Sequence, residues 1–185
     1  NSGNITGRLS VGGIVGKASE SNISNCVNRI ETVGTYLCVG GIVGILKRSS
    51  TITNCANYGI VTGREDVGGI VGQLDNSTLF NVLSSNDIKY NYAIKKIGHL
   101  VGYVSGLLTI SGYVIYNSDA MLYYYDDAGT KSSLPAFGKL DTGVTMTGET
   151  NIKALNKEQL KIGWGAWLLN GNSSKGAWGQ QLGTD

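Results

Sequence analysis

The sequence predicts an all-β fold: a parallel β-solenoid of about four coils, with an aromatic-rich strand extension and a short C-terminal capping helix. Two observations carry this prediction. The 185 residues include 28 glycines and a single proline, and this abundance of Gly, together with many Asn, Ser and Thr, disfavours long helices. A six-residue motif also recurs at nearly constant spacing, as repeat architectures require.

The motif is Val-Gly-Gly-Ile-Val-Gly. It begins at residues 11, 39 and 67, and a degraded copy, Ile-Gly-His-Leu-Val-Gly, begins at residue 97. Repeated glycines within a strand predict a bend, a positive φ, or a second backbone lying close to that face. Phosphate binding is the weaker alternative, because neither Lys-Ser/Thr nor an amphipathic helix follows the glycines. The repeated structural positions are Gly12, Gly13, Ile14, Gly16, Gly40, Gly41, Ile42, Gly44, Gly68, Gly69, Ile70 and Gly72.

A second element, an alternating strand with Asn-Cys or Asn-Val at its end, follows each of the first three copies. A unit of this length cannot bury its apolar face alone, so successive copies must stack, with equivalent residues about 4.8 Å apart. The stacking predicts two internal ladders and one polar corner. The ladders are Ile14, Ile42, Ile70 and Leu100, then Ile23, Ile52, Leu79 and Ile110; the corner holds Asn25, Asn54 and Asn81.

Val-Gly-Gly-Ile-Val-Gly followed by an Asn-Cys strand resembles the GLUG repeat of secreted and surface proteins of bacteria, which include putative adhesins and IgA-cleaving peptidases. The segment from Glu158 to Asp185, with Trp167, Asn170 and Trp178, is similar to the segment that closes such arrays. This resemblance implies a right-handed β-helix in an exported bacterial protein, with a role in adhesion. His99 in place of a motif glycine is a departure expected of a terminal repeat.

Three regions follow from these patterns. Residues 1–112 form the solenoid repeats and 113–155 a strand and hairpin extension, with a turn at residues 126–129 and a strand at 144–147. In 156–185 a helix begins near Asn156, a good N-cap with Gln159 at the capping-box position. The residues Leu160, Trp164, Trp167 and Leu168 then fall on one helical face, which we expect to cover the open end of the last coil.

Candidate catalytic groups are few, and we expect no catalytic centre, no metal site and no cofactor. Cys38 and His99 could form a nucleophile–base pair, but the chain has one histidine, and it stands where the repeat has Gly. Cys26, Cys38 and Cys55 lack metal-ligand spacing. Cys26 and Cys55 occupy equivalent positions, where either a disulfide or, preferably, two small buried thiols would fit.

Aromatic residues gather in the last 73 residues of the chain, from Tyr113 onward. Aromatic faces suit sugar rings and suit a cap core equally well. The possible glycan- or partner-binding residues are Tyr116, Tyr123, Tyr124 and Tyr125. With a formal net charge of +2, the chain has no basic stripe for nucleic acid, and no apolar run is long enough for a membrane-spanning helix.

The sequence therefore predicts a non-catalytic, extracellular or cell-surface scaffold module that binds a host protein or a surface glycan. Because the chain begins at Asn1 without Met, we expect it to be part of a longer exported protein. The alternative is an accessory substrate-binding region of a secreted peptidase or glycan-degrading enzyme. An HExxH motif in the parent protein would favour that alternative, whereas a cell-wall or lipoprotein anchor would favour an adhesin.

Overall fold

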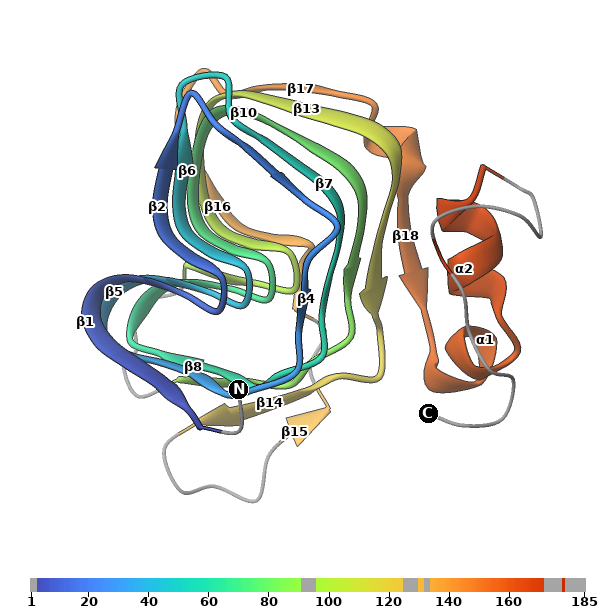
Figure 1. The fold of residues 1–185 in the computed structure, drawn as a ribbon, viewed down its shortest axis with the longest axis horizontal. Coiled ribbons are helices and arrows are strands. Elements are labelled where there is room, and N and C mark those ends of the chain that lie inside the picture. The colour runs from blue at the N-terminus through green and yellow to red at the C-terminus, as the bar shows by residue number, and fades with distance from the viewer. Residues whose placement is uncertain (1–2, 91–95, 125–129, 132–133, 172–177, 179–185) are drawn as a thin grey trace.

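A computed structural model shows a β-solenoid of about four turns and describes residues 3–90, 96–124, 130–131, 134–171 and 178 (Figure 1). The predicted fold class is confirmed. The first two coils contain seven strands: β1 (Ile5–Gly12), β2 (Val15–Ser19), β3 (Asn22–Ser24), β4 (Val27–Asn28), β5 (Thr32–Gly40), β6 (Val43–Lys47) and β7 (Thr51–Asn57). The next two contain β8 (Val61–Gly63), β9 (Glu65–Gly68), β10 (Val71–Ser84), β11 (Ile88–Tyr90), β12 (Ile97–Gly98) and β13 (Val101–Asn117).

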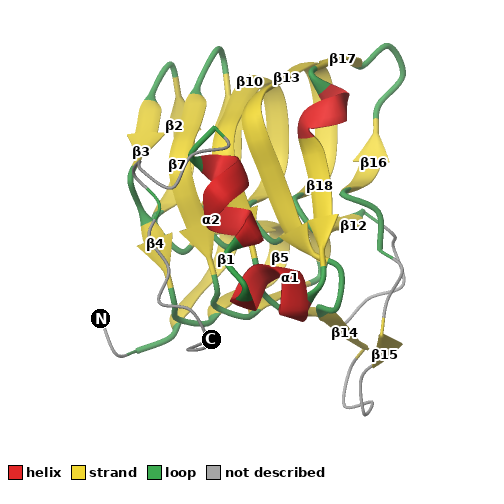
Figure 2. Cartoon of the chain, turned by 90° about the vertical axis from the view of Figure 1, so that its right-hand side faces the viewer, coloured by secondary structure: helices red, strands yellow, loops and turns green. Residues whose placement is uncertain are grey.

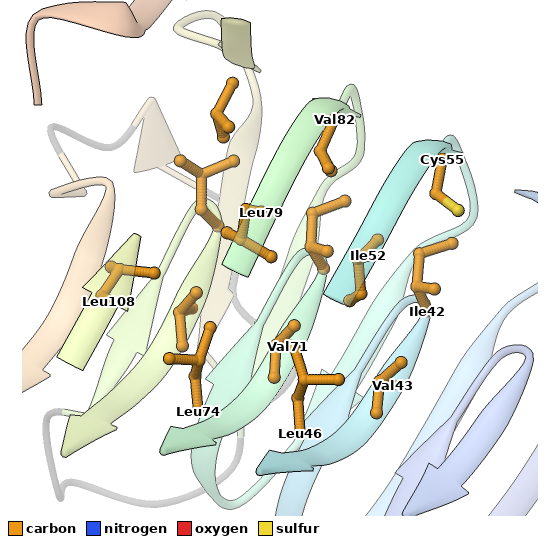
Figure 3. Close-up of a cluster of buried hydrophobic side chains, with 14 of the residues drawn as sticks. Ile42, Val43, Leu46, Ile52, Cys55, Val71, Leu74, Leu79, Val82 and Leu108 are labelled. Atoms are coloured by element: carbon orange, nitrogen blue, oxygen red, sulfur yellow. The ribbon is translucent and has the colours of Figure 1, made fainter. Parts of the chain in front are cut away.

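Equivalent strands pair in parallel from coil to coil and form two sheets, one of eight strands and one of ten. In the larger sheet, Ile52 lies in register between Ile23 and Leu79, and Leu79 lies beside Ile110. All four side chains are buried, which confirms the predicted ladder. Figure 3 shows side chains from β6, β7, β10 and β13 gathered in this core.

The other predicted ladder is only partly correct. Ile42, Ile70 and Leu100 are fully buried, but Ile14 is 43% exposed. Ile14 remains in register, because its backbone N–H donates to the carbonyl of Ile42 at 3.0 Å. It belongs to the first described coil, which has a neighbouring coil on one side only, so its side chain is covered on one side only.

Close backbone approach explains the motif glycines. A Cβ on Gly41 would collide with the side-chain amide of Asn57 and with the carbonyl of Gly69. A Cβ on Gly40 would collide with the carbonyl of Val43 and come within 2.7 Å of Gly72 N. Neither glycine has a positive φ. Of the three reasons expected for these glycines, two are therefore correct at this turn: the chain bends at Gly41, and a second backbone lies close to both glycines.

The degraded fourth copy keeps the same turn by changing both contacting residues. The residue facing the second motif glycine is Asn57 in coil 2 and Ser84 in coil 3, and Tyr116 is in register with Ser84 in coil 4. His99 takes the glycine position there, and its ring stacks on Tyr116 with centroids 4.8 Å apart. The His99–Tyr116 pair thus fills the space that a glycine and a polar side chain fill in the earlier coils.

The chain continues past the fourth coil with short elements: β14 (Met121–Tyr124), β15 (Thr130–Lys131), β16 (Phe137–Leu140), β17 (Thr145–Thr147), a 3-10 turn (Glu149–Asn151), β18 (Ile152–Leu155), α1 (Lys157–Lys161) and α2 (Trp164–Leu169). Strands β14 and β15 pair antiparallel, as predicted for a hairpin, and its turn lies outside the described residues. Strands β16, β17 and β18 all pair in parallel with β13, so they add a partial fifth layer. The predicted boundary after residue 112 falls inside β13. The prediction that a helix covers the last coil is wrong, because these three strands lie along its edge.

Candidate functional site

The C-terminal helices lie against the side of the solenoid, not over its end (Figure 2). An outward-facing row from β7, β10 and β13 forms their contact surface. This row and the helical segment together make one apolar cluster of Ala56, Leu83, Ile115, Leu155, Leu160 and Leu169. The predicted covering of the terminal rung is therefore wrong, because strands β16 to β18 occupy that edge and leave the helices free to pack laterally.

The predicted start of the helix is confirmed, but its predicted apolar face is not. Asn156 accepts a hydrogen bond from Gln159 N, and the Gln159 side chain accepts one from Asn156 N, which completes the capping box. Gly163, at φ +84°, then separates two short helices. The helical spacing does not continue across this break, so Trp164 and Trp167 are 51% and 46% exposed. Of the four residues predicted for the face, only Leu160 and Leu168 pack against the solenoid.

A pocket of about 380 Å³ lies where the end of α2 meets a corner of the solenoid. Its lining residues come from three successive coils and from the end of the helix. They are Asn54, Phe80, Asn81, Gly112, Tyr113, Leu169, Asn170 and Gly171. None of them is charged. The pocket therefore combines two aromatic side chains, three amides and apolar surface, a set suited to an uncharged polar ligand.

The solenoid wall of this pocket is the predicted asparagine corner. Asn25, Asn54 and Asn81 all have φ between 50° and 56°, and Gly112 continues the row at φ +60°. This left-handed conformation favours Asn and Gly over other residues, which explains why Gly112 replaces Asn in the fourth coil. The amides also bond along the axis as predicted, since Asn54 Nδ2 donates to Asn25 Oδ1 at 3.4 Å.

Two amide atoms in this wall lack a hydrogen-bond partner among the described residues, and of these the Asn54 atom is buried beyond the reach of a ligand. Asn54 Oδ1 is buried and accepts no hydrogen bond from the described residues. The Asn81 Oδ1 accepts a bond from Tyr113 N at 3.1 Å, and no bond to the part of the chain that the structure describes uses its Nδ2. The Asn170 amide, by contrast, is engaged with the backbone of Trp178, at 2.8 and 3.0 Å, and so fixes the opposite wall.

The structure describes the side chains of two of the four tyrosines predicted as a binding group, Tyr116 and Tyr123. Tyr116 is half-buried and stacks on His99. Tyr123 lies on β14, with the Lys89 ammonium 5.9 Å from its ring centroid. Tyr124 ends β14, and Tyr125 lies outside the described residues. The sequence missed Phe80 and Asn170 as pocket residues, and the only available signal was Phe80 at a position that holds Thr53 or Ser111 in adjacent coils.

The structure does not bring Cys38 and His99 together as a nucleophile–base pair. The Cys38 thiol contacts Asp66 Oδ2 at 3.7 Å and Gln73 Oε1 at 3.4 Å, whereas the His99 ring contacts Tyr116. Burial, aided by the Asp66 charge, raises the pKa of Cys38 to about 12, and burial lowers the pKa of His99 to about 4. At neutral pH the thiol is therefore protonated and the imidazole neutral, so neither is activated.

Asp66 and Lys96 form a partly buried ionic cluster that the sequence reasoning missed. Lys96 Nζ lies 3.3 Å from Asp66 Oδ1 and 3.1 Å from Glu65 Oε1. Burial raises the pKa of Asp66 in spite of this cation, and the pKa of Lys96 is raised because the two carboxylates outweigh its own burial. Asp66 and Lys96 follow Cys38 at the repeat spacing, so the spacing was a signal for the cluster. We interpret the cluster as a coil-to-coil contact.

The two equivalent cysteines are free thiols, as preferred over a disulfide. Cys55 is fully buried, and its Sγ donates toward the carbonyl of Thr53 at 3.2 Å. Cys26 is half-buried and donates toward Ser24 O at the same distance. Burial raises the pKa of Cys55 to about 11, so this thiol stays protonated at neutral pH and behaves as a small apolar side chain.

Within the described ranges, no group of three or more His, Cys, Asp or Glu residues is arranged to hold a metal ion. No helix in the described parts of the chain has the length and apolar character needed to cross a membrane. Comparison of the chain with protein-family models, with curated proteins and with solved structures found no match. The candidate site therefore rests on the geometry of the pocket and its surroundings.

Proposed function

We propose that the chain is a non-catalytic repeat module of a secreted or cell-surface protein, and that it presents a surface for binding glycans or proteins. The resemblance of its repeats to GLUG repeats supports this proposal. The protonation states of the candidate nucleophile and base also support it, since the Cys38 thiol and the His99 imidazole are both uncharged at neutral pH.

Exposed apolar side chains on the helical segment carry the proposal. Ile162, Trp164 and Trp167 are 62%, 51% and 46% exposed; we call these three residues the cap patch. Large apolar side chains gathered on a surface mark interaction sites, and Trp is enriched among the residues that dominate binding energy. The patch is held rigidly, because Leu160 and Leu169 of the same helices are buried against the solenoid.

Aromatic–cation pairs elsewhere on the coils extend the possible surface. The Tyr36 ring is 39% exposed, and the guanidinium groups of Arg8 and Arg64 lie 5.8 and 5.4 Å from its centroid. Arg29 lies 4.8 Å from the centroid of Tyr58, which is 40% exposed. Stacking restricts these side chains before any partner arrives, which lowers the entropy that binding must oppose.

The test is direct binding of the purified chain to an array of immobilised glycans and to purified mucins and serum glycoproteins. We expect saturable binding that the double variant Trp164→Ser/Trp167→Ser weakens at least tenfold. Leu9→Ser is the control, because it removes an apolar side chain that is 53% exposed on β1, outside both the cap patch and the aromatic–cation pairs. Binding by wild type that both variants retain in full would exclude the cap patch, and no binding to any probe would refute the proposed function.

A further inference from the structure

A pocket lies between α2 and the asparagine corner in the described part of the chain. We infer that it is a subsite for one neutral pyranose ring, the terminal sugar of a glycan. This inference rests on the proposed function and deepens it, since it names the ligand class and the residues that take it. Three properties of the pocket support it.

The first property is size. The volume of about 380 Å³ lies at the lower end of the roughly 300–1,000 Å³ range of small-molecule sites. This space suits a single ring better than an oligosaccharide chain or a folded protein segment. Gly171 lines the pocket without a side chain.

The second property is charge. None of the described lining residues is acidic or basic. Against these residues a sialic acid, a sugar phosphate or a sulfated sugar would lose hydration without gaining a counter-charge, which is costly. The Lys153 ammonium lies 6.0 Å from the Tyr113 ring centroid, and Lys153 is not among the described lining residues. The described lining therefore favours uncharged ligands.

The third property is the combination of aromatic and amide groups. Phe80 and Tyr113 supply aromatic surface for the apolar C–H face of a pyranose. The Asn81 Nδ2 has no partner among the described residues and can donate a hydrogen bond to a sugar hydroxyl.

The repeat supplies its own substitutions for the test. Asn81→Gly copies Gly112, keeps the left-handed backbone and removes the Nδ2 donor. Phe80→Thr copies Thr53, the residue in register in the preceding coil, and removes one aromatic wall. Asn25→Gly is the matched control, because it makes the same change in the same corner row at an exposed position outside the pocket.

Binding is measured by saturation-transfer NMR with the methyl glycosides of glucose, galactose, mannose and N-acetylglucosamine, and with N-acetylneuraminic acid as the charged comparison. Melting temperatures show whether each variant folds. We expect at least one neutral glycoside to bind, the acid to bind at least tenfold more weakly, Asn81→Gly and Phe80→Thr each to raise Kd at least fivefold, and Asn25→Gly to leave it unchanged.

The other outcomes separate this inference from the proposed function. Sugar binding that the cap-patch variant abolishes and both pocket variants retain would overturn the pocket as the subsite and leave the proposed function standing. Binding to proteins alone would do the same. An equal loss in Asn25→Gly would show a structural effect and also overturn the inference, whereas an absence of all binding would overturn both.

Discussion

Replacing Ile42 with alanine, beside the same replacement at Ile14, tests which side chains hold the coils together. Both residues stand in the local sequence Val-Gly-Gly-Ile-Val-Gly, so helix or strand propensity and turn chemistry are matched. Ile42 is fully buried in the core cluster, whereas Ile14 is 43% exposed. The pair therefore isolates burial as the variable.

The expected magnitudes differ severalfold. Ile42→Ala removes methyl groups from a close-packed interior and leaves a cavity, which costs about 2–5 kcal/mol of unfolding free energy. Ile14→Ala removes a side chain that is little more than half buried and borders open space, so no closed cavity forms and the loss is about 1 kcal/mol or less. Against a typical domain stability of about 5–15 kcal/mol, the first change is severe and the second mild.

The measurement is urea unfolding followed by circular dichroism, with the slope of free energy against urea compared between variants. Unchanged slopes and a loss at Ile42 several times larger than at Ile14 are the expected result. Equal losses would refute the reasoning, because they would mean that the first coil is covered as completely as the second. A larger loss at Ile14 would place the inward face on the wrong side of the turn.

Three further predictions follow from the same packing. Ile42→Asp should unfold or severely destabilise the chain in a melting assay, because it buries a charge. Lys47→Asp should be nearly neutral, because Lys47 ends β6 at the surface. The pKa of Lys47 is lowered chiefly by the nearby charge of Lys17, so removing the Lys47 charge relieves a repulsion. The free energy of unfolding should fall by about 3 kcal/mol as pH is lowered from 6.5 to about 4, because His99 takes up a proton in the unfolded chain and not in the folded one. In urea titrations at several pH values, the double variant His99→Gly/Tyr116→Ser should lack this His99-dependent loss. Deleting residues 156–185 should expose the outward apolar row and raise binding of a hydrophobic dye, yet sedimentation should show no end-to-end oligomers, because β16 to β18 still cover β13.

Repetition made the coils predictable from the sequence. Because residues at equivalent positions of the repeat must stack, each copy predicts the same neighbours. The ladder from Ile23 to Ile110 and the corner of Asn25, Asn54 and Asn81 could therefore be placed from the sequence alone. The capping box at Asn156 was predictable for a different reason, since it depends on four consecutive residues. Local and repeated patterns are the kinds of information that a single sequence carries.

The fifth layer and the cap were not predictable, because they depend on contacts that no pattern repeats. Strands β16 to β18 lack the motif, but parallel pairing with β13 needs only extended backbone and a few inward apolar side chains, such as Phe137 and Met146. The helical spacing from Leu160 to Leu168 failed because Gly163 has a positive φ and interrupts the helix. The pocket exists only once α2 has docked, so its residues share no signature in the sequence.

Departures from the repeat become informative when each is considered with the residue that it contacts. His99 looked like a functional residue because it is the single histidine, yet its change from Gly is matched by Tyr116, and the two rings stack in place of the earlier Gly–polar pair. A matched change of this kind indicates packing.

Phe80 is the contrary case. It stands in register between Thr53 and Ser111, on the outward side of β10, and is only partly buried. No interior contact requires a large aromatic side chain there, and its ring lines the pocket with Asn54 and Asn81. Phe80 lines the pocket together with Leu169 of α2, so two explanations compete for its aromatic ring: packing beneath the docked helix and contact with a ligand. Phe80→Thr separates them, because a packing role lowers the melting temperature, whereas a ligand contact raises Kd in a variant that melts as wild type does.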